Sequence, residues 1–205
     1  MTVQRHSSFG TLPLSLVDRL GIWLSRRAIL RHLTRRHPYR VLELGCGYAA
    51  CNLFAIEDVA DKLVAVDVNL STAVKSHPKF VAIESRIEET LPQLATEQFD
   101  VILLISVLEH LRHPEEVLQA CKNMLGSGGV LLVNVPTWLG KLFLEFSAFR
   151  LRLSPKQEMD DHKMYYDKRD LWPLLVKVGF LPSAITMYYH KLGLNLFAVA
   201  KQETI

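Results

Sequence analysis

Cysteine is scarce in this chain, and its three cysteines are not spaced to act together. Cys46, Cys51 and Cys121 are odd in number and form no CxxC pair. This argues against a disulfide framework and against a zinc site, because both need cysteines in matched sets. We therefore expect a protein of a reducing compartment, the cytoplasm.

Long apolar stretches are missing as well. The longest clear one, residues 101–108, is much shorter than the ~20 residues that a membrane-spanning helix needs. The first residues include Arg5 and His6 and lack the apolar core and cleavage site of a secretory signal. With 49% hydrophobic and 22% charged residues, the composition predicts one globular domain with a substantial core.

Acidic residues are nearly absent from the first 40 positions. This segment has eight arginines and only Asp18 as an acid, a net charge of +7, whereas the remainder has 16 basic and 20 acidic residues, net −4. A basic segment on a mildly acidic body is typical of proteins that meet an anionic membrane, an anionic substrate or nucleic acid. An arginine-rich helix face that is simply solvated remains the other interpretation.

From residue 40 onward, short apolar runs alternate with helical patterns. The runs that we predict to be strands are residues 41–44, 63–66, 80–83, 99–105 and 130–135, with helices at 49–57 and 114–125. Near-continuous apolar strands separated by helices are typical of a parallel sheet covered on both faces. Two final strands, at 182–189 and 194–200, are joined near Gly193 and predict an antiparallel hairpin at a sheet edge.

Three further segments are expected to be helical. Residues 14–37 form one helix or two short ones, because the apolar stripe changes register after Ser25. Residues 138–153 have an apolar face, and Asp167 is a good N-cap for a helix that ends before Gly179. We divide the chain into a basic helical segment, residues 1–39, and an α/β domain, residues 40–205, with a helical insertion at 138–158.

A glycine turn directly after the first strand is the most informative motif. Gly45 and Gly47 lack a Cβ, so the backbone can turn tightly there and a ligand can approach closely. Asp67 follows at the end of the second strand, where its carboxylate can accept hydrogen bonds from both hydroxyls of a ribose. Together these features predict a ligand of the adenosine type.

Glu43 distinguishes between two ligands of that type. A dinucleotide would place its pyrophosphate near this turn, and a carboxylate two residues before Gly45 would repel it. S-adenosylmethionine has a sulfonium and an ammonium instead, and a nearby anion stabilises both. The residues therefore favour S-adenosylmethionine over a nicotinamide cofactor.

Over residues 40–136 the chain resembles the class I S-adenosylmethionine-dependent methyltransferases, in particular the small-molecule group that includes the ubiquinone-biosynthesis O-methyltransferases. The resemblance rests on Val41-Leu42-Glu43-Leu44-Gly45-Cys46-Gly47, Val66-Asp67, Phe99-Asp100-Val101-Ile102, Val107-Leu108-Glu109-His110-Leu111 and residues 125–135. It implies a Rossmann-like, doubly wound α/β fold. The sheet would have seven mostly parallel strands, an antiparallel C-terminal strand and helices on both faces.

The resemblance also implies where the cofactor binds. The glycine turn would hold the methionine part, the acid after the second strand the ribose, and residues after the third strand the adenine. The cofactor-binding residues carried over in this way are Glu43, Gly45, Cys46, Gly47, Asp67, Val68, Arg86, Ile87 and Ser106.

Two positions depart from the family's pattern. Ala49 stands where the family has a third glycine, a mild change. Ser85-Arg86-Ile87 stands where many members have an aspartate for the adenine amino group. Either Arg86 stacks on the ring or the backbone of Ile87 recognises it, and we favour Ile87.

Two histidines are candidate catalytic bases for an acceptor hydroxyl. His110 lies just after the fourth strand, and His162 precedes two tyrosines in a loop that borders the acceptor pocket in the family. Structural roles, such as bracing a helix or bonding within the loop, are the alternatives. Some quinone-pathway relatives bind a metal through two glutamates and a histidine in the loop that corresponds to that of His110. Ser106 replaces one of these carboxylates here, so we predict no metal.

The expected acceptor is a small molecule with a hydroxyl group, of the sugar, lipid-linked or quinone-like kind. The helical insertion at 138–158 would cover it, as related enzymes place a substrate cover there. With the basic N-terminal helices, the insertion would also allow peripheral contact with an anionic membrane at its inner face. Packing against the core or in a homodimer is the alternative.

Two other functions compete with methyl transfer. A nicotinamide-dependent oxidoreductase would share the glycine turn and Asp67, and a catalytically silent S-adenosylmethionine-binding protein would keep the site without turnover. Nucleic acid is not an expected partner. The chain has no Asn-Pro-Pro-Tyr-type tetrapeptide for a flipped base, and its arginines are not interleaved with aromatic residues.

Overall fold

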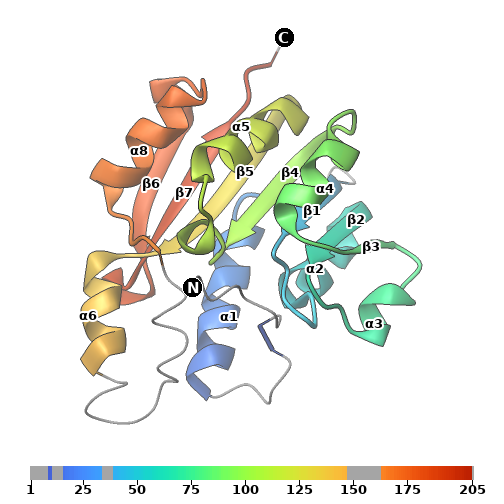
Figure 1. The fold of residues 1–205 in the computed structure, drawn as a ribbon, viewed down its shortest axis with the longest axis horizontal. Coiled ribbons are helices and arrows are strands. Elements are labelled where there is room, and N and C mark those ends of the chain that lie inside the picture. Colours follow the sequence, from blue (N-terminus) through green and yellow to red (C-terminus); the bar gives the residue numbers. More distant parts are fainter. Residues whose placement is uncertain (1–8, 11–15, 34–38, 147–162, 205) are drawn as a thin grey trace.

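The computed structural model describes residues 9–10, 16–33, 39–146 and 163–204. Its centre is a sheet with strand order β3-β2-β1-β4-β5-β7-β6 (Figure 1). The strands are β1 Tyr39–Leu44, β2 Ala60–Asp67, β3 Phe80–Glu84, β4 Phe99–Ile105, β5 Leu125–Pro136, β6 Ile185–His190 and β7 Asn195–Lys201. The first five pair in parallel, and β7 runs antiparallel to its neighbours β5 and β6. The predicted seven-stranded, Rossmann-like sheet with an antiparallel C-terminal strand is confirmed.

Helices cover both faces of the sheet, with α4, α5 and α8 on one face and α1 and α2 on the other (Figure 1). The α-helices are α1 Leu16–Leu30, α2 Cys51–Ala55, α3 Thr72–Lys75, α4 Ile87–Leu94, α5 Pro114–Met124, α6 Trp138–Phe146 and α8 Lys168–Lys177. Short 3-10 turns include η1 Glu57–Val59, η2 Leu108–His110, η4 Pro182–Ala184 and η5 Lys191–Gly193. Helices α3 and α4 were not expected from the apolar pattern. None of the described helices is long and apolar enough to span a bilayer.

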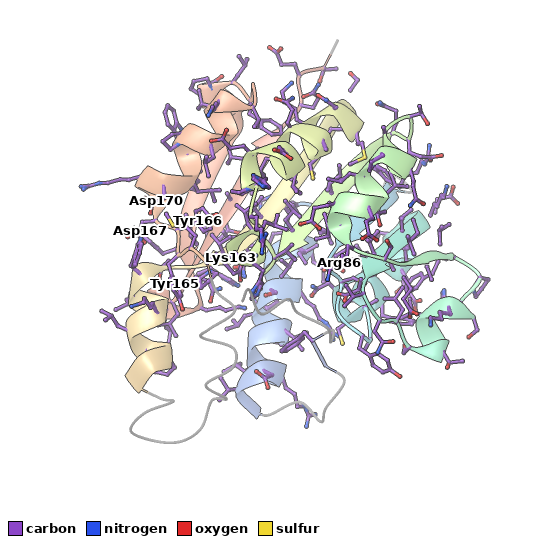
Figure 2. The ribbon with its side chains drawn as sticks, viewed as in Figure 1. Arg86, Lys163, Tyr165, Tyr166, Asp167 and Asp170 are labelled. Atoms are coloured by element: carbon purple, nitrogen blue, oxygen red, sulfur yellow. The ribbon has the colours of Figure 1, made fainter. Side chains whose placement is uncertain are left out.

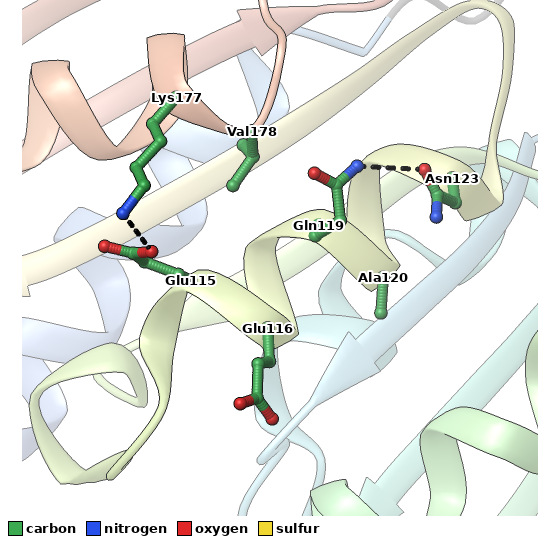
Figure 3. Close-up of a pocket in the computed structure, with 7 residues that line it drawn as sticks. All are labelled: Glu115, Glu116, Gln119, Ala120, Asn123, Lys177 and Val178. Carbon is green, nitrogen blue, oxygen red and sulfur yellow. Dashed lines mark hydrogen bonds and ion pairs between the residues drawn. The ribbon is translucent and has the colours of Figure 1, made fainter.

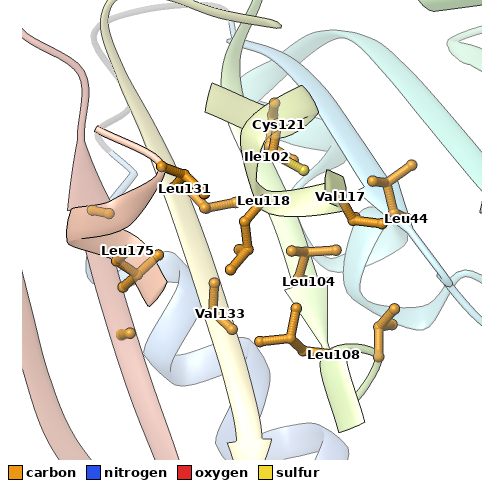
Figure 4. Packing of buried hydrophobic residues seen from close by; sticks show 14 of the residues in the cluster. Leu44, Ile102, Leu104, Leu108, Val117, Leu118, Cys121, Leu131, Val133 and Leu175 are labelled. Atoms are coloured by element: carbon orange, nitrogen blue, oxygen red, sulfur yellow. The ribbon is translucent and has the colours of Figure 1, made fainter. Parts of the chain in front are cut away.

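Two buried clusters form the core, one on each face of the sheet. On the first, Leu118 of α5 and Leu175 of α8 lie over Ile102 and Val133 (Figure 4). On the second, Ile29 of α1 belongs to the cluster that contains the strand residues beneath it. The helix α1 is thus one continuous element over Leu16–Leu30 and contributes to the same core as the sheet.

The carboxyl ends of the parallel strands meet at one edge of the sheet, which positions the site. Because β6 is antiparallel to β7, it runs in the direction of β5, so the turn η5 lies at this edge too. Thr137 fixes that turn, as its Oγ1 donates to the Gly193 carbonyl (2.7 Å) and its N–H to the Leu194 carbonyl (3.0 Å). The strand order changes direction between β1 and β4, where ligands of open α/β sheets bind.

The helical insertion predicted for residues 138–158 is described in its first part only. Helix α6 follows β5 directly and comes so close to the η5 turn that a Cβ on Gly140 would collide with the Leu194 carbonyl oxygen. The remainder of the insertion lies outside the described residues.

Candidate active site

The predicted glycine turn lies at the point where the strand order reverses. Gly45 and Gly47 have φ angles of 72° and 76°, which L-residues rarely adopt. A Cβ on Gly45 would lie 2.5 Å from Cγ2 of Val107, which follows β4, so this close approach requires glycine. Between them, Cys46 is buried, and burial raises the pKa of its thiol far above the usual range. Cys46 is therefore a packing residue of the turn and not a nucleophile.

Asp67 is bonded to the same turn. Its Oδ2 accepts a hydrogen bond from the Gly47 N–H (2.7 Å), and its Oδ1 accepts one from the Val68 N–H (2.8 Å). Each carboxylate oxygen has a second lone pair, so the group can still accept bonds from a ligand's hydroxyls. The carboxylate thus shapes the turn after β1 at the edge where the strands end.

Glu43, like Glu109 of the same site, is a carboxyl with only 1% exposure. Its Oε1 accepts a hydrogen bond from Nδ2 of Asn52 (2.7 Å). Burial raises the pKa of Glu43 to about 8 and the negative charge of Asp67 adds to this, while Asn52 and the Arg26 guanidinium act in the opposite direction. Desolvation thus outweighs the stabilising partners.

Three polar atoms around Glu43 are left over. Within the described residues, Oε2 of Glu43, Oδ1 of Asn52 and Nε of Arg26 are buried and have no hydrogen-bond partner. Such atoms cost free energy unless a ligand or water satisfies them. An acceptor and a donor of opposite charge suit a ligand that has both an ammonium and a carboxylate.

The residues predicted to meet an adenine follow β3. Ser85 donates its N–H to the Asp67 carbonyl (3.0 Å), which keeps this segment beside β2. Arg86 is the residue before α4, and Ile87 is the first residue of that helix. The N–H of Ile87 belongs to the first turn, where N–H groups have no intrahelical acceptor. This position is compatible with the interpretation that the backbone of Ile87 recognises the base.

The loop after β4 contains the predicted Ser106 and His110. Ser106 is exposed and has φ 57°, a strained backbone for a residue that is not glycine. It is held by Asn134, whose carbonyl accepts the Ser106 N–H (2.8 Å) and whose Nδ2 lies 3.4 Å from its Oγ. Glu109 is buried in η2, and His110 is half-buried beside it.

Residues 163–166 come from the C-terminal part of the chain and contact the loop after β4 and the end of β5. Lys163 donates its N–H to the Glu109 carbonyl (2.8 Å) and its Nζ to the His110 carbonyl. Tyr166 donates its N–H to the Pro136 carbonyl (3.0 Å). Its phenol pKa is raised to about 12, by burial first and then by the charges of Glu109 and Asp170. Lys163 and Tyr166 lie on one side of the site and Arg86 on the other (Figure 2).

The other predicted base, His162, lies just outside the described residues. The prediction for it stays untested, although the neighbouring Lys163 is fixed to the loop of His110. No three histidine, cysteine, aspartate or glutamate side chains of the described residues are grouped in a way that would hold a metal ion.

Sequence reasoning missed three residues of the site. Arg26 and Asn52 meet Glu43 only through folding, although Asn52 lies within the helix that the glycine turn opens. Lys191 of η5 is partly buried, which lowers the pKa of its ammonium to about 8, while the Glu109 charge counteracts this. No local pattern marks a lysine in a hairpin turn as a buried group, so only the fold could reveal it.

A surface hollow of about 490 Å³ lies elsewhere, between α5 and α8 (Figure 3). An ion pair from Lys177 to Glu115 (2.7 Å) crosses it. None of the predicted site residues lines this hollow. It therefore belongs to the packing of the two helices.

The fold and the glycine turn, Glu43 and Asp67 at the switch point define a Rossmann-like domain of the class I methyltransferase type. A family model described as "Methyltransferase domain" matches residues 16–181. The chain belongs to this family, as the resemblance of residues 40–136 predicted.

Curated proteins similar to this chain include several ubiquinone biosynthesis O-methyltransferases. That of Dinoroseobacter shibae is 30% identical over 83% of this chain and 74% of its own length. That of Glaesserella parasuis is 27% identical over 57% of this chain and 55% of its own length. The chain thus spans little more than half of some of these relatives, 55% here and 56% for the protein of Nitrosococcus oceani.

Solved structures show the same fold at low identity. A SAM dependent methyltransferase from Archaeoglobus fulgidus has a TM-score of 0.66 and 16% identity, over 88% of this chain and 94% of that chain. The plantazolicin methyltransferase BpumL was solved in complex with a desmethylPZN analog and SAH. It has a TM-score of 0.67 and 13% identity, over 90% of this chain and 84% of that chain.

Proposed function

We propose that the chain transfers the methyl group of S-adenosylmethionine to a hydroxyl of a small-molecule acceptor. The observation that carries the proposal is a pair of groups of opposite charge, Glu43 and Arg26, each with a buried polar atom that has no partner, Oε2 and Nε. The methionine part of the cofactor has the ammonium and carboxylate that would satisfy them. Membership in the methyltransferase-domain family supports the same cofactor.

Each part of the cofactor has a candidate partner on this edge. Glu43 and Arg26 would hold the amino-acid end beside the turn of Gly45, Cys46 and Gly47. Asp67 and Val68 would hold the ribose, Ile87 with Arg86 the adenine, and Ser106 would face the methionine end. The turn allows a ligand to approach closely, since Gly45 and Gly47 have no Cβ and keep φ angles of 72° and 76°.

Bound S-adenosylmethionine supplies a methyl carbon activated by its sulfonium, so the protein mainly has to position the acceptor and remove a proton. His110 is our proposed proton acceptor, with His162 as the alternative. The loop of His110 is fixed by Lys163, which restricts where the imidazole can lie. Glu109 and Tyr166 are buried next to this loop and help to exclude water.

An apolar, lipid-linked or quinone-like acceptor is favoured by the surface beside the site. Helix α6 exposes Leu139, Leu142 and Phe143, which share one helix face, by 54%, 61% and 48%. Leu192, at the tip of η5, is 98% exposed. Apolar groups that face solvent at the mouth of a site suit an acceptor with an apolar part. We therefore propose the insertion at 138–158 as its cover.

The enzyme would work in the cytoplasm, in peripheral contact with an anionic membrane, where such acceptors reside. Two alternatives remain: a silent S-adenosylmethionine-binding protein and a nicotinamide-dependent oxidoreductase. Glu43 disfavours the second, because a pyrophosphate has no donor for its unpartnered Oε2 and would be repelled by the carboxylate whenever it is ionised. A homodimer would be compatible with all three.

Calorimetric titration with S-adenosylmethionine, S-adenosylhomocysteine and NAD tests the cofactor. We expect binding of the first two only, and loss of binding in Asp67→Ala. Because that substitution also removes the bonds to Gly47 and Val68, circular dichroism must show that the variant is folded. Preference for NAD, or no binding of either sulfur compound, would overturn the proposal.

Turnover tests the base once an acceptor is found. We expect His110→Ala to reduce kcat by about 100-fold, the lower range for general-base catalysis, with little change in cofactor affinity. Unchanged turnover in His110→Ala together with a loss in His162→Ala would assign the role to His162. No turnover with any hydroxyl acceptor, despite cofactor binding, would favour the silent binding protein.

A further inference from the structure

One face of α1 is built into the core and the opposite face is exposed. Ser25, Ala28 and Ile29 on the inner face are 2%, 1% and 0% exposed. Leu20 and Trp23 on the outer face are 57% and 49% exposed. At 3.6 residues per turn these two sets project to opposite sides of the helix. The outer side therefore presents large apolar groups to solvent, although the inner side of the helix is packed in the core.

Arginines accompany these apolar groups. Arg19 and Arg27 on α1 and Arg31 directly after it are exposed, as is Leu30 (43%). The Arg27 guanidinium lies 5.2 Å from the centre of the Trp23 ring. We call the set Arg19, Leu20, Trp23, Arg27, Leu30 and Arg31 the arginine–tryptophan face.

No acid of the described residues 16–33 belongs to this face. Asp18 is the only acidic residue there, and it lies two turns before the buried Ser25, on the inner side of the helix. The face thus combines leucine, tryptophan and positive charge. This is the composition of helices that lie in the headgroup region of an anionic bilayer, with tryptophan at the interface.

We propose that the arginine–tryptophan face of α1 docks this domain on an anionic lipid bilayer. The inference rests on the proposed function, since docking would bring the site to a lipid-linked acceptor. A second copy of the chain fits less well. Two such faces in contact would bring six arginines together without a counter-charge, which is repulsive. Anionic headgroups supply the opposite charge instead.

Helix α8 offers a comparison, because its exposed tryptophan has basic residues on the same helix but a different charge balance. It also exposes a tryptophan, Trp172 (41%), and three basic residues, Lys168, Arg169 and Lys177. Lys177, however, is paired with Glu115 (2.7 Å), and the first turn of α8 contains Asp170. The charge of α8 is therefore partly neutralised, and this helix is a natural control.

Co-sedimentation of the full chain with vesicles tests the charge. We expect binding to equal parts of phosphatidylcholine and phosphatidylglycerol and none to phosphatidylcholine alone. Arg19→Gln/Arg27→Gln/Arg31→Gln should weaken binding about 100-fold, because each basic residue near such a surface contributes about 1 kcal/mol. The matched α8 variant, Lys168→Gln/Arg169→Gln/Lys177→Gln, should bind within about threefold of the unchanged chain.

Tryptophan fluorescence locates the contact. In variants that keep a single tryptophan, lipids brominated near the headgroup should quench Trp23 and leave Trp172 unquenched. Equal quenching of both, an equal loss of binding in the α8 variant, or binding to neutral vesicles would overturn the proposal. So would a dimer in solution that the α1 variant dissociates while its vesicle binding is unchanged.

Affinity for S-adenosylhomocysteine separates this proposal from the function. None of the three arginines contacts Glu43 or Asp67 in any interaction described above, so all variants should keep that affinity. Cofactor binding without vesicle binding would refute the docking face and leave the methyltransferase proposal in place. Vesicle binding without cofactor binding would do the reverse.

Discussion

Cofactor affinity should depend on pH through one buried carboxyl group. Without a ligand, burial raises the pKa of Glu43 to about 8, so the group is mostly protonated at neutral pH. The cofactor's ammonium favours the ionised form, so binding has to release a proton. Because the pKa is raised in the ligand-free protein, affinity should fall as the pH falls below about 8.

The magnitude follows from the size of the shift. Well below the pKa, each pH unit costs about 1.4 kcal/mol, a factor of about ten in affinity. Between about pH 7 and about pH 6 the dissociation constant of S-adenosylhomocysteine should therefore rise nearly tenfold. Its own ammonium stays charged in this range, since α-amino groups have a pKa of about 8.

Calorimetry in two buffers with different ionisation enthalpies measures both affinity and proton release. Glu43→Gln keeps an oxygen for Asn52 but cannot titrate, so its affinity should be lower and independent of pH. Glu84→Gln is the matched control. Glu84 is the last residue of β3, and its pKa is lowered by Lys75 and the Leu70 N–H. A pH-independent affinity of the unchanged chain, or the same slope in Glu43→Gln, would refute the reasoning.

Three further changes test the packing of the edge. Gly45→Ala should lower the free energy of unfolding by about 1–3 kcal/mol and remove most of the cofactor affinity, because φ is 72° and the new Cβ meets Val107. Adding Val107→Ala should restore part of the stability, as measured by urea titration. Gly140→Ala should push α6 away from the Leu194 carbonyl and lower Tm by several degrees, and an unchanged Tm would contradict this contact. Burial lowers the pKa of His190 to about 4, and the charges of Lys191 and Arg31 add to the shift. Below about pH 6.5 the unfolded chain therefore binds more protons than the folded one, so the stability should decrease as the pH falls further. Since the ring is only half-buried, we expect a loss of about 1 kcal/mol, which His190→Phe should abolish in urea titrations at about pH 7 and about pH 5.

Local sequence patterns predicted most of the fold. Strands such as β4 are apolar except for one residue, here Asp100, and Phe99–Ile105 agrees with the predicted bounds. The N-cap at Asp167 is confirmed, and in return the Asp167 N–H donates to the Asp170 carboxylate (2.8 Å), because a capping box depends only on residues three apart. Helix α4 was missed since Pro92 lies inside it, and α3 because it is only four residues long.

The candidate site was predictable where its residues follow strands. Glu43, Gly45, Gly47 and Asp67 could be placed together because the carboxyl ends of parallel strands meet at one edge. The proximity of Arg26 to Glu43 could not, since it depends on how α1 packs across the sheet. The same holds for Lys191 and Glu109, which the hairpin brings together from distant parts of the chain.

The bonds of Asp67 to the glycine turn have a consequence for binding kinetics. Because the carboxylate binds the Gly47 N–H, the turn is held in this shape without a ligand. The cofactor then loses its own freedom on binding while the turn loses little, so association need not wait for a conformational change. If Asp67 also binds the ribose as proposed, the same carboxylate serves two properties. A substitution there would alter the empty turn and the ribose contact together, so a change of cofactor specificity at Asp67 would bring a loss of stability.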